Sequence, residues 1–154
     1  MDIFSAPIDR STIIFRLARL VRRWRQVLDT EFQSVGLTDA TWRPLLHLHF
    51  LGNGIRQKDL AASVGIEGPS LVRLLDTLVI KGLIVRTEDS TDRRAKLLAL
   101  TPAGSEAVER IRETVRRVEN QLLAPLSDGE IEGVAATILR LEATVGDLRQ
   151  RSRG

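Results

Sequence analysis

The chain has 154 residues, of which 43% are hydrophobic, 28% charged and 4% aromatic, with a formal net charge of +3. This length suits one domain, or one compact domain with an extension, whose core needs no disulfide or metal. The absence of cysteine excludes disulfide scaffolds, thiol nucleophiles, cysteine-ligated zinc and thiol-based redox sensing. The sequence shows no secretory leader and no apolar run of about 18 residues, so we expect a cytoplasmic protein.

The positive charge is carried mainly by arginine, which supplies 20 of the 23 cations. Arginine suits forked contacts to phosphate, carboxylate or base edges. A GC-rich genome would also enrich arginine, so the count alone decides nothing. Position is more informative, because residues 53–101 hold eight cations against six acids, whereas residues 102–154 hold eight against nine.

An amphipathic helix is predicted over residues 11–32, because its apolar residues recur at spacings of mostly three and four. Gly36 ends this helix, and Thr38 is a suitable N-cap for a second helix over residues 39–51. The glycines of residues 52–54 end the second helix. The apolar stripe of the first helix consists of Ile13, Leu17, Leu20, Trp24, Val27 and Phe32.

Two short helices and a hairpin are predicted next. The first short helix covers residues 56–64 and ends at Gly65, and the second opens at residues 67–69 and ends before Gly82. Residues 83–86 and 95–100 have strand-like composition, and residues 87–94 form a polar link between them. This pattern predicts a two-stranded β-hairpin with a long charged tip.

Two further helices are predicted in the last third of the chain. Thr101-Pro102 begins the first, and the capping-box sequence of residues 127–130 begins the second. Their apolar residues alternate at spacings of three and four, a period typical of coiled-coil seams. Packing on the chain's own core is the alternative, but so short a chain has little core left to cover. We therefore expect a dimerisation hairpin with a frayed tail at residues 149–154.

The block of residues 55–101 has the arrangement of a helix-turn-helix followed by a hairpin. Ala61 is small enough for the second helix to cross closely, and Gly65 makes the turn. Leu71, Leu74, Leu75 and Leu78 lie on one side of the second helix. The residues left for DNA are Pro69, Ser70, Val72, Arg73 and Thr77.

Arg73 is the strongest candidate for base readout, because its guanidinium can donate two hydrogen bonds to guanine. Ser70 can bond a base or a phosphate, and Pro69 or Val72 can contact a thymine methyl. We expect Asp76 to orient Arg73. Without the surrounding helix-turn-helix pattern, we would interpret Arg73 as an ordinary solvent-exposed arginine with no role in binding.

The hairpin tip supplies the second set of candidate DNA contacts: Arg93, Arg94 and Lys96. An arginine on a narrow loop can enter a minor groove, where the negative potential is strongest over A·T tracts. Asp92 has the wrong charge for phosphate, so we expect it to pair with one of these arginines. The alternative is that the charged residues of this loop only keep it solvated and do not contact DNA.

Three runs together resemble the MarR family of winged-helix regulators, and within it the SlyA branch. They are residues 65–73 (GIEGPSLVR), 81–84 (KGLI) and 92–101 (DRRAKLLALT), with further similarity at residues 17–25 and 37–42. One departure is Glu67, where many members carry a better cap such as Ser. The resemblance implies a mainly α fold with a small β-hairpin wing: a winged helix-turn-helix with N- and C-terminal dimerisation helices. Residues 1–36 and 102–154 would form the dimerisation region and residues 37–101 the DNA-binding domain.

The same resemblance implies a homodimeric transcriptional regulator, usually a repressor, bound to a pseudo-palindromic site in double-stranded DNA on the nucleoid. It also implies release by a small aromatic or phenolic anion. The matching ligand positions are Arg22, Trp24, Arg25 and Trp42, where arginine beside an aromatic wall suits a benzoate-like carboxylate. Alternatively, both tryptophans belong to the core and the arginines form interface ion pairs.

Two other classes of function compete with this interpretation. One is a protein-interaction module that keeps the fold without specific DNA binding, which the low net charge allows. The other is an enzyme, which the paucity of catalytic residue types disfavours. His47 and His49 are spaced i, i+2 and lie on different helix faces, so we expect neither a metal site nor a cofactor. The operator, the regulated genes, the effector and the sign of regulation are not readable from the sequence.

Overall fold

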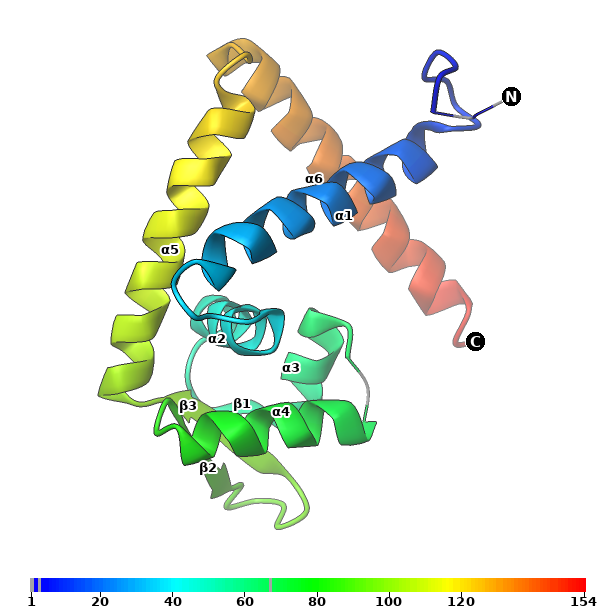
Figure 1. The fold of residues 1–154 in the computed structure, drawn as a ribbon. Helices are drawn as coiled ribbons and strands as arrows, with labels where there is room; N and C mark the ends of the chain where they lie inside the picture. Colours follow the sequence, from blue (N-terminus) through cyan, green and yellow to red (C-terminus); the bar gives the residue numbers. More distant parts are fainter. Residues whose placement is uncertain (1, 3, 67) are drawn as a thin grey trace. The chain divides into compact units, whose positions relative to one another are not determined.

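The computed structural model describes residues 2, 4–66 and 68–154. These residues contain six helices and three short strands joined by loops (Figure 1). The mainly α fold with a small β wing is confirmed. Of residues 67–69, which were predicted to open the fourth helix, Glu67 lies outside the described residues. In chain order the elements are α1 (Ile13–Gln33), α2 (Asp39–Leu51), β1 (Ile55–Arg56), α3 (Gln57–Val64), α4 (Gly68–Ile80), β2 (Ile84–Glu88), β3 (Lys96–Leu100), α5 (Pro102–Leu123) and α6 (Asp128–Arg151).

The chain divides into two compact units, Met1–Arg116 and Arg117–Gly154. The first unit contains α1 to β3 and most of α5, and the second contains the end of α5 and all of α6. No helix among the described residues is both long enough and apolar enough to cross a membrane. The predicted division into a dimerisation region and a DNA-binding domain stays a prediction.

The core of the first unit is built from apolar side chains spaced three or four residues apart on its helices. On α4, Leu71, Leu75 and Leu78 are buried as predicted, and Leu74 is half-buried. Burying one such side chain stabilises the folded chain by roughly 1.5–3 kcal/mol. The largest fully buried side chains also include Phe32, Leu45, Leu48, Leu60, Ile84, Leu98 and Ile111.

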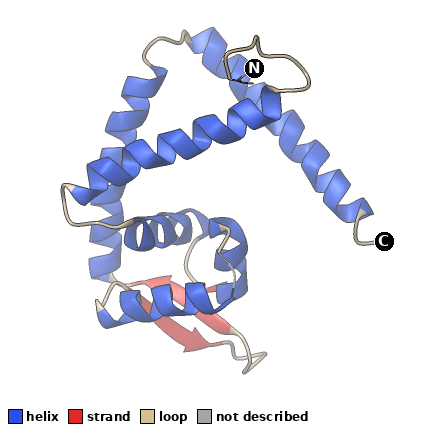
Figure 2. Ribbon diagram, turned by 45° about the vertical axis from the view of Figure 1, so that its right-hand side comes forward, coloured by secondary structure: helices blue, strands red, loops and turns tan. Residues whose placement is uncertain are grey.

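The sheet has three antiparallel strands in the order β1-β3-β2, one strand more than the sequence predicted. Ile55 of β1 pairs with Leu98 of β3, and Ile84 of β2 pairs with Leu100. The sequence pattern wrongly placed Arg56 at the start of a helix and Ile55 just before it. A strand of two residues is too short to show an alternating pattern, and the strand that it pairs with is distant in the sequence. The loop between β2 and β3 projects beyond the strands (Figure 2).

The helix ends follow the predicted caps with one exception. The Ser127 hydroxyl accepts from the Glu130 amide at 3.2 Å and the Glu130 carboxylate accepts from the Ser127 amide at 3.1 Å, which confirms the capping box. Thr38 stands at the N-cap of α2, but its hydroxyl bonds the Thr41 hydroxyl at 3.2 Å and caps no backbone amide. At the other end of the chain, α6 continues to Arg151, beyond the predicted start of fraying.

Gly104 allows α5 to approach the turn that precedes β2. A Cβ atom at this position would lie 1.9 Å from the Leu83 carbonyl oxygen. That oxygen accepts a hydrogen bond from the Thr101 amide at 3.1 Å. The Thr101 hydroxyl in turn accepts from the Gly104 amide at 3.0 Å and donates to the Gly82 carbonyl at 2.6 Å. The start of α5 is therefore fixed by contacts that leave no room for a side chain.

We expect Gly104→Ala to lower the free energy of unfolding by about 3 kcal/mol, because the added methyl group must displace backbone. Gly133→Ala on α6 is the matched control, since a Cβ there meets nothing within 4 Å. The control should be neutral or stabilising by up to about 1 kcal/mol, because alanine has the higher helix propensity. Urea unfolding of both variants measures the difference. Equal midpoints would contradict the close approach at Gly104.

Candidate nucleic-acid interface

Five of the eight residues predicted to contact DNA lie on the outward face of α4. Because the leucines of α4 are committed to the core, the opposite face of the helix is left exposed. The Thr77 hydroxyl donates to the Arg73 carbonyl at 3.1 Å, so this hydroxyl is already used within the helix. The exposed residues are Pro69, Ser70, Val72, Arg73 and Thr77.

Asp76 does not orient Arg73, which corrects the prediction from spacing. Its carboxylate accepts a hydrogen bond from the Arg86 guanidinium of β2 at 2.8 Å. This contact depends on how β2 lies against α4, which no spacing within the helix reveals. Asp76 therefore ties α4 to the sheet. Within the described residues, the Arg73 guanidinium has no ion-pair partner and remains available to a ligand.

The loop of the wing presents Arg93 and Arg94 to solvent. Asp92 was predicted to pair with an arginine side chain, but its carboxylate instead accepts from the backbone amide of Arg94 at 3.0 Å. The Ala95 amide bonds the Asp92 carbonyl at 3.0 Å and closes the same turn. Asp92 therefore shapes the loop backbone. The half-buried Lys96 lies opposite Glu88 in the sheet and pairs with it at 3.3 Å.

Asp89 fixes the base of the wing and was missed by the sequence reasoning. Its carboxylate accepts from the amide and the hydroxyl of Thr91 at 2.9 and 2.8 Å, and from the Arg56 guanidinium at 3.1 Å. The hydrogen bonds from Thr91, followed by Arg56, hold the pKa of Asp89 below its usual range. Their stabilisation is therefore present above the ordinary pKa of an aspartate and is lost as the pH falls through the lowered value. The Asp-x-Thr spacing, which favours a local turn, was the available signal.

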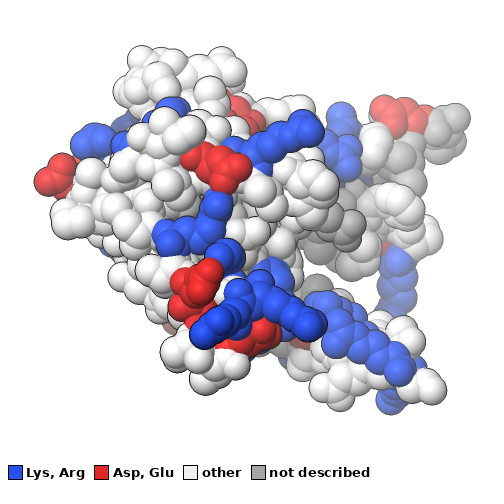
Figure 3. All heavy atoms as spheres, turned by 90° about the horizontal axis from the view of Figure 1, so that it is seen from below, with Lys and Arg blue, Asp and Glu red and all other residues white. Residues whose placement is uncertain are grey.

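Cationic and acidic side chains alternate on the face that includes the wing. Seen from below, a group of Lys and Arg side chains lies directly beside Asp and Glu side chains (Figure 3). Exposed pairs of this kind contribute only about 0–1 kcal/mol each to stability. Their main effect is geometric, since the acids hold some of the cations in place and leave others free.

The four predicted ligand-binding residues do not form one site in the described chain. Trp42 is 4% exposed, its ring lies 4.9 Å from that of Phe32, and its Nε1 donates to Asp29 at 2.8 Å. Trp24 is half-buried. Arg22 and Arg25 line an open hollow of about 500 Å³, together with Ile14, Leu17, Ala18 and Val21. The two arginines are thus brought together beside aliphatic side chains, and neither tryptophan lines that hollow.

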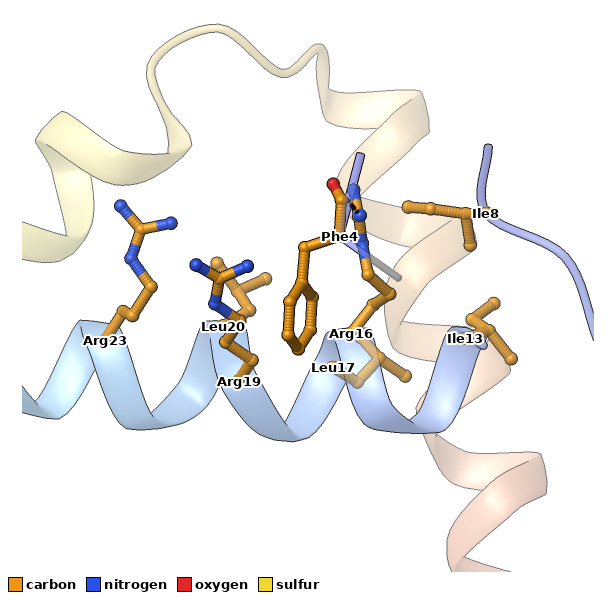
Figure 4. Close-up of a pocket in the computed structure, with 8 residues that line it drawn as sticks. All are labelled: Phe4, Ile8, Ile13, Arg16, Leu17, Arg19, Leu20 and Arg23. Atoms are coloured by element: carbon orange, nitrogen blue, oxygen red, sulfur yellow. Dashed lines mark hydrogen bonds between the residues drawn. The ribbon is translucent and has the colours of Figure 1, made fainter. Parts of the chain in front are cut away.

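A second cationic hollow lies where the N-terminal segment covers α1 (Figure 4). The Phe4 ring centroid is 3.9 Å from the Arg19 guanidinium carbon, and Arg16 donates to the Phe4 carbonyl. The hollow measures about 400 Å³ and also borders Arg23. Two of its three arginines are therefore already engaged by the chain's own Phe4, a contact that the sequence reasoning did not anticipate.

The two histidines have separate surroundings. His47 Nδ1 bonds the Ser63 hydroxyl at 2.7 Å, whereas the His49 ring packs against Phe50. Burial, followed by the nearby charges of Arg43 and Arg25, lowers the pKa of His47. Neutral imidazole is therefore its form at physiological pH.

A family model and several solved structures relate the chain to known proteins. The MarR family model matches residues 35–95. The transcriptional regulator PA3341 superposes with a TM-score of 0.79 at 36% identity, over 88% of this chain and 98% of that one. The S. aureus MepR–DNA complex superposes with a TM-score of 0.70 at 27% identity, over 90% and 99% of the two chains. SlyA superposes with a TM-score of 0.74 at 22% identity, over 88% and 94%, which shows a shared fold only. Assignment to the SlyA branch thus stays a prediction.

Proposed function

Because the chain belongs to the MarR family of transcriptional regulators, we propose that it is a homodimeric, sequence-specific DNA-binding protein that acts on the nucleoid. The observation that carries this proposal is the exposed face of α4, where the Arg73 guanidinium has no ion-pair partner among the described residues, together with an arginine-bearing wing in the same compact unit. The likeness to MepR, which was solved bound to DNA, supports it.

In this proposal, α4 enters the major groove and Arg73 donates its fork of hydrogen bonds to a guanine. Ser70, Pro69 and Val72 contact neighbouring bases or phosphate. The wing carries Arg93 and Arg94 to the adjacent backbone and minor groove. The Asp76–Arg86 pair, at 2.8 Å, holds α4 on the strand that leads into the wing. Both DNA-contacting elements therefore engage together.

Selection of bound sequences from random duplex DNA tests the proposal and should yield a two-fold-symmetric motif. On that motif, Arg73→Ala should cost about 1–3 kcal/mol of binding free energy and relax the preference at one base position. Arg110→Ala, an exposed arginine of α5, is the matched control and should bind like the wild type. Fluorescence anisotropy on the selected duplex and its single-base variants measures both effects.

Two outcomes would contradict this assignment. Wild-type protein that enriches no motif would favour a protein-interaction module on the same fold. Arg73→Ala protein that binds the motif as the wild type does would remove Arg73 from the readout.

The proposed homodimer rests on apolar stripes that one chain leaves exposed. On α6, Val134, Ile138, Leu141, Val145 and Leu148 are between 41% and 55% exposed, and no residue of this helix is buried. Single chains in solution rarely expose so long a row of large apolar side chains. A second copy of the chain would cover the row and would present two α4 helices to half-sites roughly 34 Å apart.

We expect Leu141→Asp to convert the dimer into a monomer of 17.2 kDa, because a carboxylate in the seam would be buried without a partner. Leu139→Asp is the matched control: the same substitution on the same helix, but off the three-four stripe. Sedimentation equilibrium gives the mass of each variant. Retention of the wild-type mass by Leu141→Asp would contradict an interface along this stripe.

We further propose that the hollow beside Arg22 and Arg25 binds a small aromatic or phenolic anion. Two guanidinium groups next to aliphatic side chains suit a planar carboxylate, and this supports the proposal. Binding would release DNA only to the extent that the anion prefers the shape that does not bind DNA.

Titration of the protein–operator complex with benzoate should release the DNA, and Arg22→Ala should raise the midpoint of release about tenfold or more. Arg10→Ala, an exposed arginine ahead of α1, serves as the control. Release with the same midpoint in Arg22→Ala and the wild type would place the anion elsewhere.

A further inference from the structure

A cationic hollow lies between the start of α3 and the base of the wing. It measures about 320 Å³, and we name it the wing-base hollow. Arg56 and Lys58 were not among the DNA contacts predicted from the sequence, and the fold brings them to Arg94 and Lys96. The charged and polar residues that line the hollow are Arg56, Gln57, Lys58, Asp92, Arg94 and Lys96.

The four cations of the hollow fall into two classes. Arg56 is held by Asp89 at 3.1 Å, and Lys96 is held by Glu88 at 3.3 Å. Within the described part of the chain, the side chains of Lys58 and Arg94 have no ion-pair partner. Asp92 is the single acid in the lining, and its carboxylate is engaged by the backbone amide of Arg94. In the hollow, Arg56 and Lys96 are therefore held by acids, whereas Lys58 and Arg94 are available to bind an anion.

The start of α3 adds a further attraction for an anion. Its N-cap residue, Arg56, has extended backbone angles and supplies no side-chain acceptor to the amides of the first turn. Uncapped amides at a helix N-terminus carry a partial positive charge and bind phosphate oxygens. Gln57 and Lys58, the first residues of α3, line the hollow directly. The lining of the hollow thus combines cationic side chains with the first residues of a helix.

We propose that the wing-base hollow binds one phosphate of the DNA backbone, with Lys58 and Arg94 as its charged contacts. The proposal rests on the DNA binding proposed above and names a further part of that interface. A free phosphate has the same chemistry, but the hollow is continuous with the wing through Arg94 and Lys96, and this favours the backbone. Arg93 does not line the hollow, so of the two adjacent arginines it is the one left for the minor groove.

The salt dependence of DNA binding tests this assignment. Lys58→Ala should weaken binding to the selected operator and to an unrelated duplex by the same factor. It should also lower the slope of log Kd against log salt, and the Lys58→Ala, Arg94→Ala double variant, which keeps no charged contact with that phosphate, should lower the slope by about one. Lys81→Ala, the exposed lysine just after α4, is the matched control and should leave the slope unchanged.

The two wing arginines should behave differently from each other. Arg94→Ala should weaken all sequences equally, as Lys58→Ala does, whereas Arg93→Ala should reduce the preference for A·T pairs beside the half-sites. Because Lys58 and Arg94 share one phosphate, the double variant should lose less binding free energy than the two single losses added together. Full additivity would contradict a shared phosphate.

Three results would overturn the assignment, and they are distinguishable. If the wild type binds its operator specifically and Lys58→Ala matches it in affinity and slope, the wing-base assignment fails alone. If inorganic phosphate binds the protein only when Lys58 is present, and leaves operator binding unchanged at equal ionic strength, the hollow takes free phosphate. If the wild type selects no DNA, the proposed function fails and the wing-base assignment fails with it.

Discussion

Burial of the leucines of α4 is the constraint on which the rest of the interface depends. Leu71, Leu75 and Leu78 are each at most 2% exposed, and together they fix the rotation of the helix about its axis. Rotating α4 to hide Arg73 would expose this apolar face at a cost of several kcal/mol. The outward display of Arg73 is thus a consequence of core packing, and it is present before any ligand arrives.

Acidic side chains position the interface more than they neutralise it. Asp76 ties α4 to β2, Asp89 ties the wing to β1, and Asp92 shapes the loop between Arg93 and the sheet. Each contact is partly solvated and contributes little to overall stability. Their value is that they hold the backbone of the two elements proposed to contact DNA, while the side chains of Arg73, Arg93 and Arg94 have no ion-pair partner in the described part of the chain. A modest net charge of +3 is compatible with a locally cationic surface for this reason.

The apolar stripes of α1 and α6 express a different constraint. Phe32, at the end of α1, is fully buried, whereas Leu17 and Leu20 of the same stripe are exposed. On α6 the three-four row is exposed from Val134 to Leu148. Apolar surface of this extent is costly in water, and this is the physical reason for proposing a second copy of the chain. The hollow beside Arg22 and Arg25, which we propose to bind an anion, borders the same surface through Leu17, so anion binding and association would act on shared residues.

By itself the sequence determined the helices, the hairpin strands, the capping box at Ser127 and the outward face of α4, because each depends on local spacing or on one apolar period. Contacts between segments far apart in the sequence became visible only in the folded chain. The strand at Ile55 pairs with Leu98, Asp76 pairs with Arg86 in place of Arg73, and Trp42 lies in the core against Phe32. The meeting of Lys58 with Arg94 belongs to the same class. Local sequence patterns do not predict such contacts, because the contacting residues are far apart in the sequence and are not related by a helix or strand period.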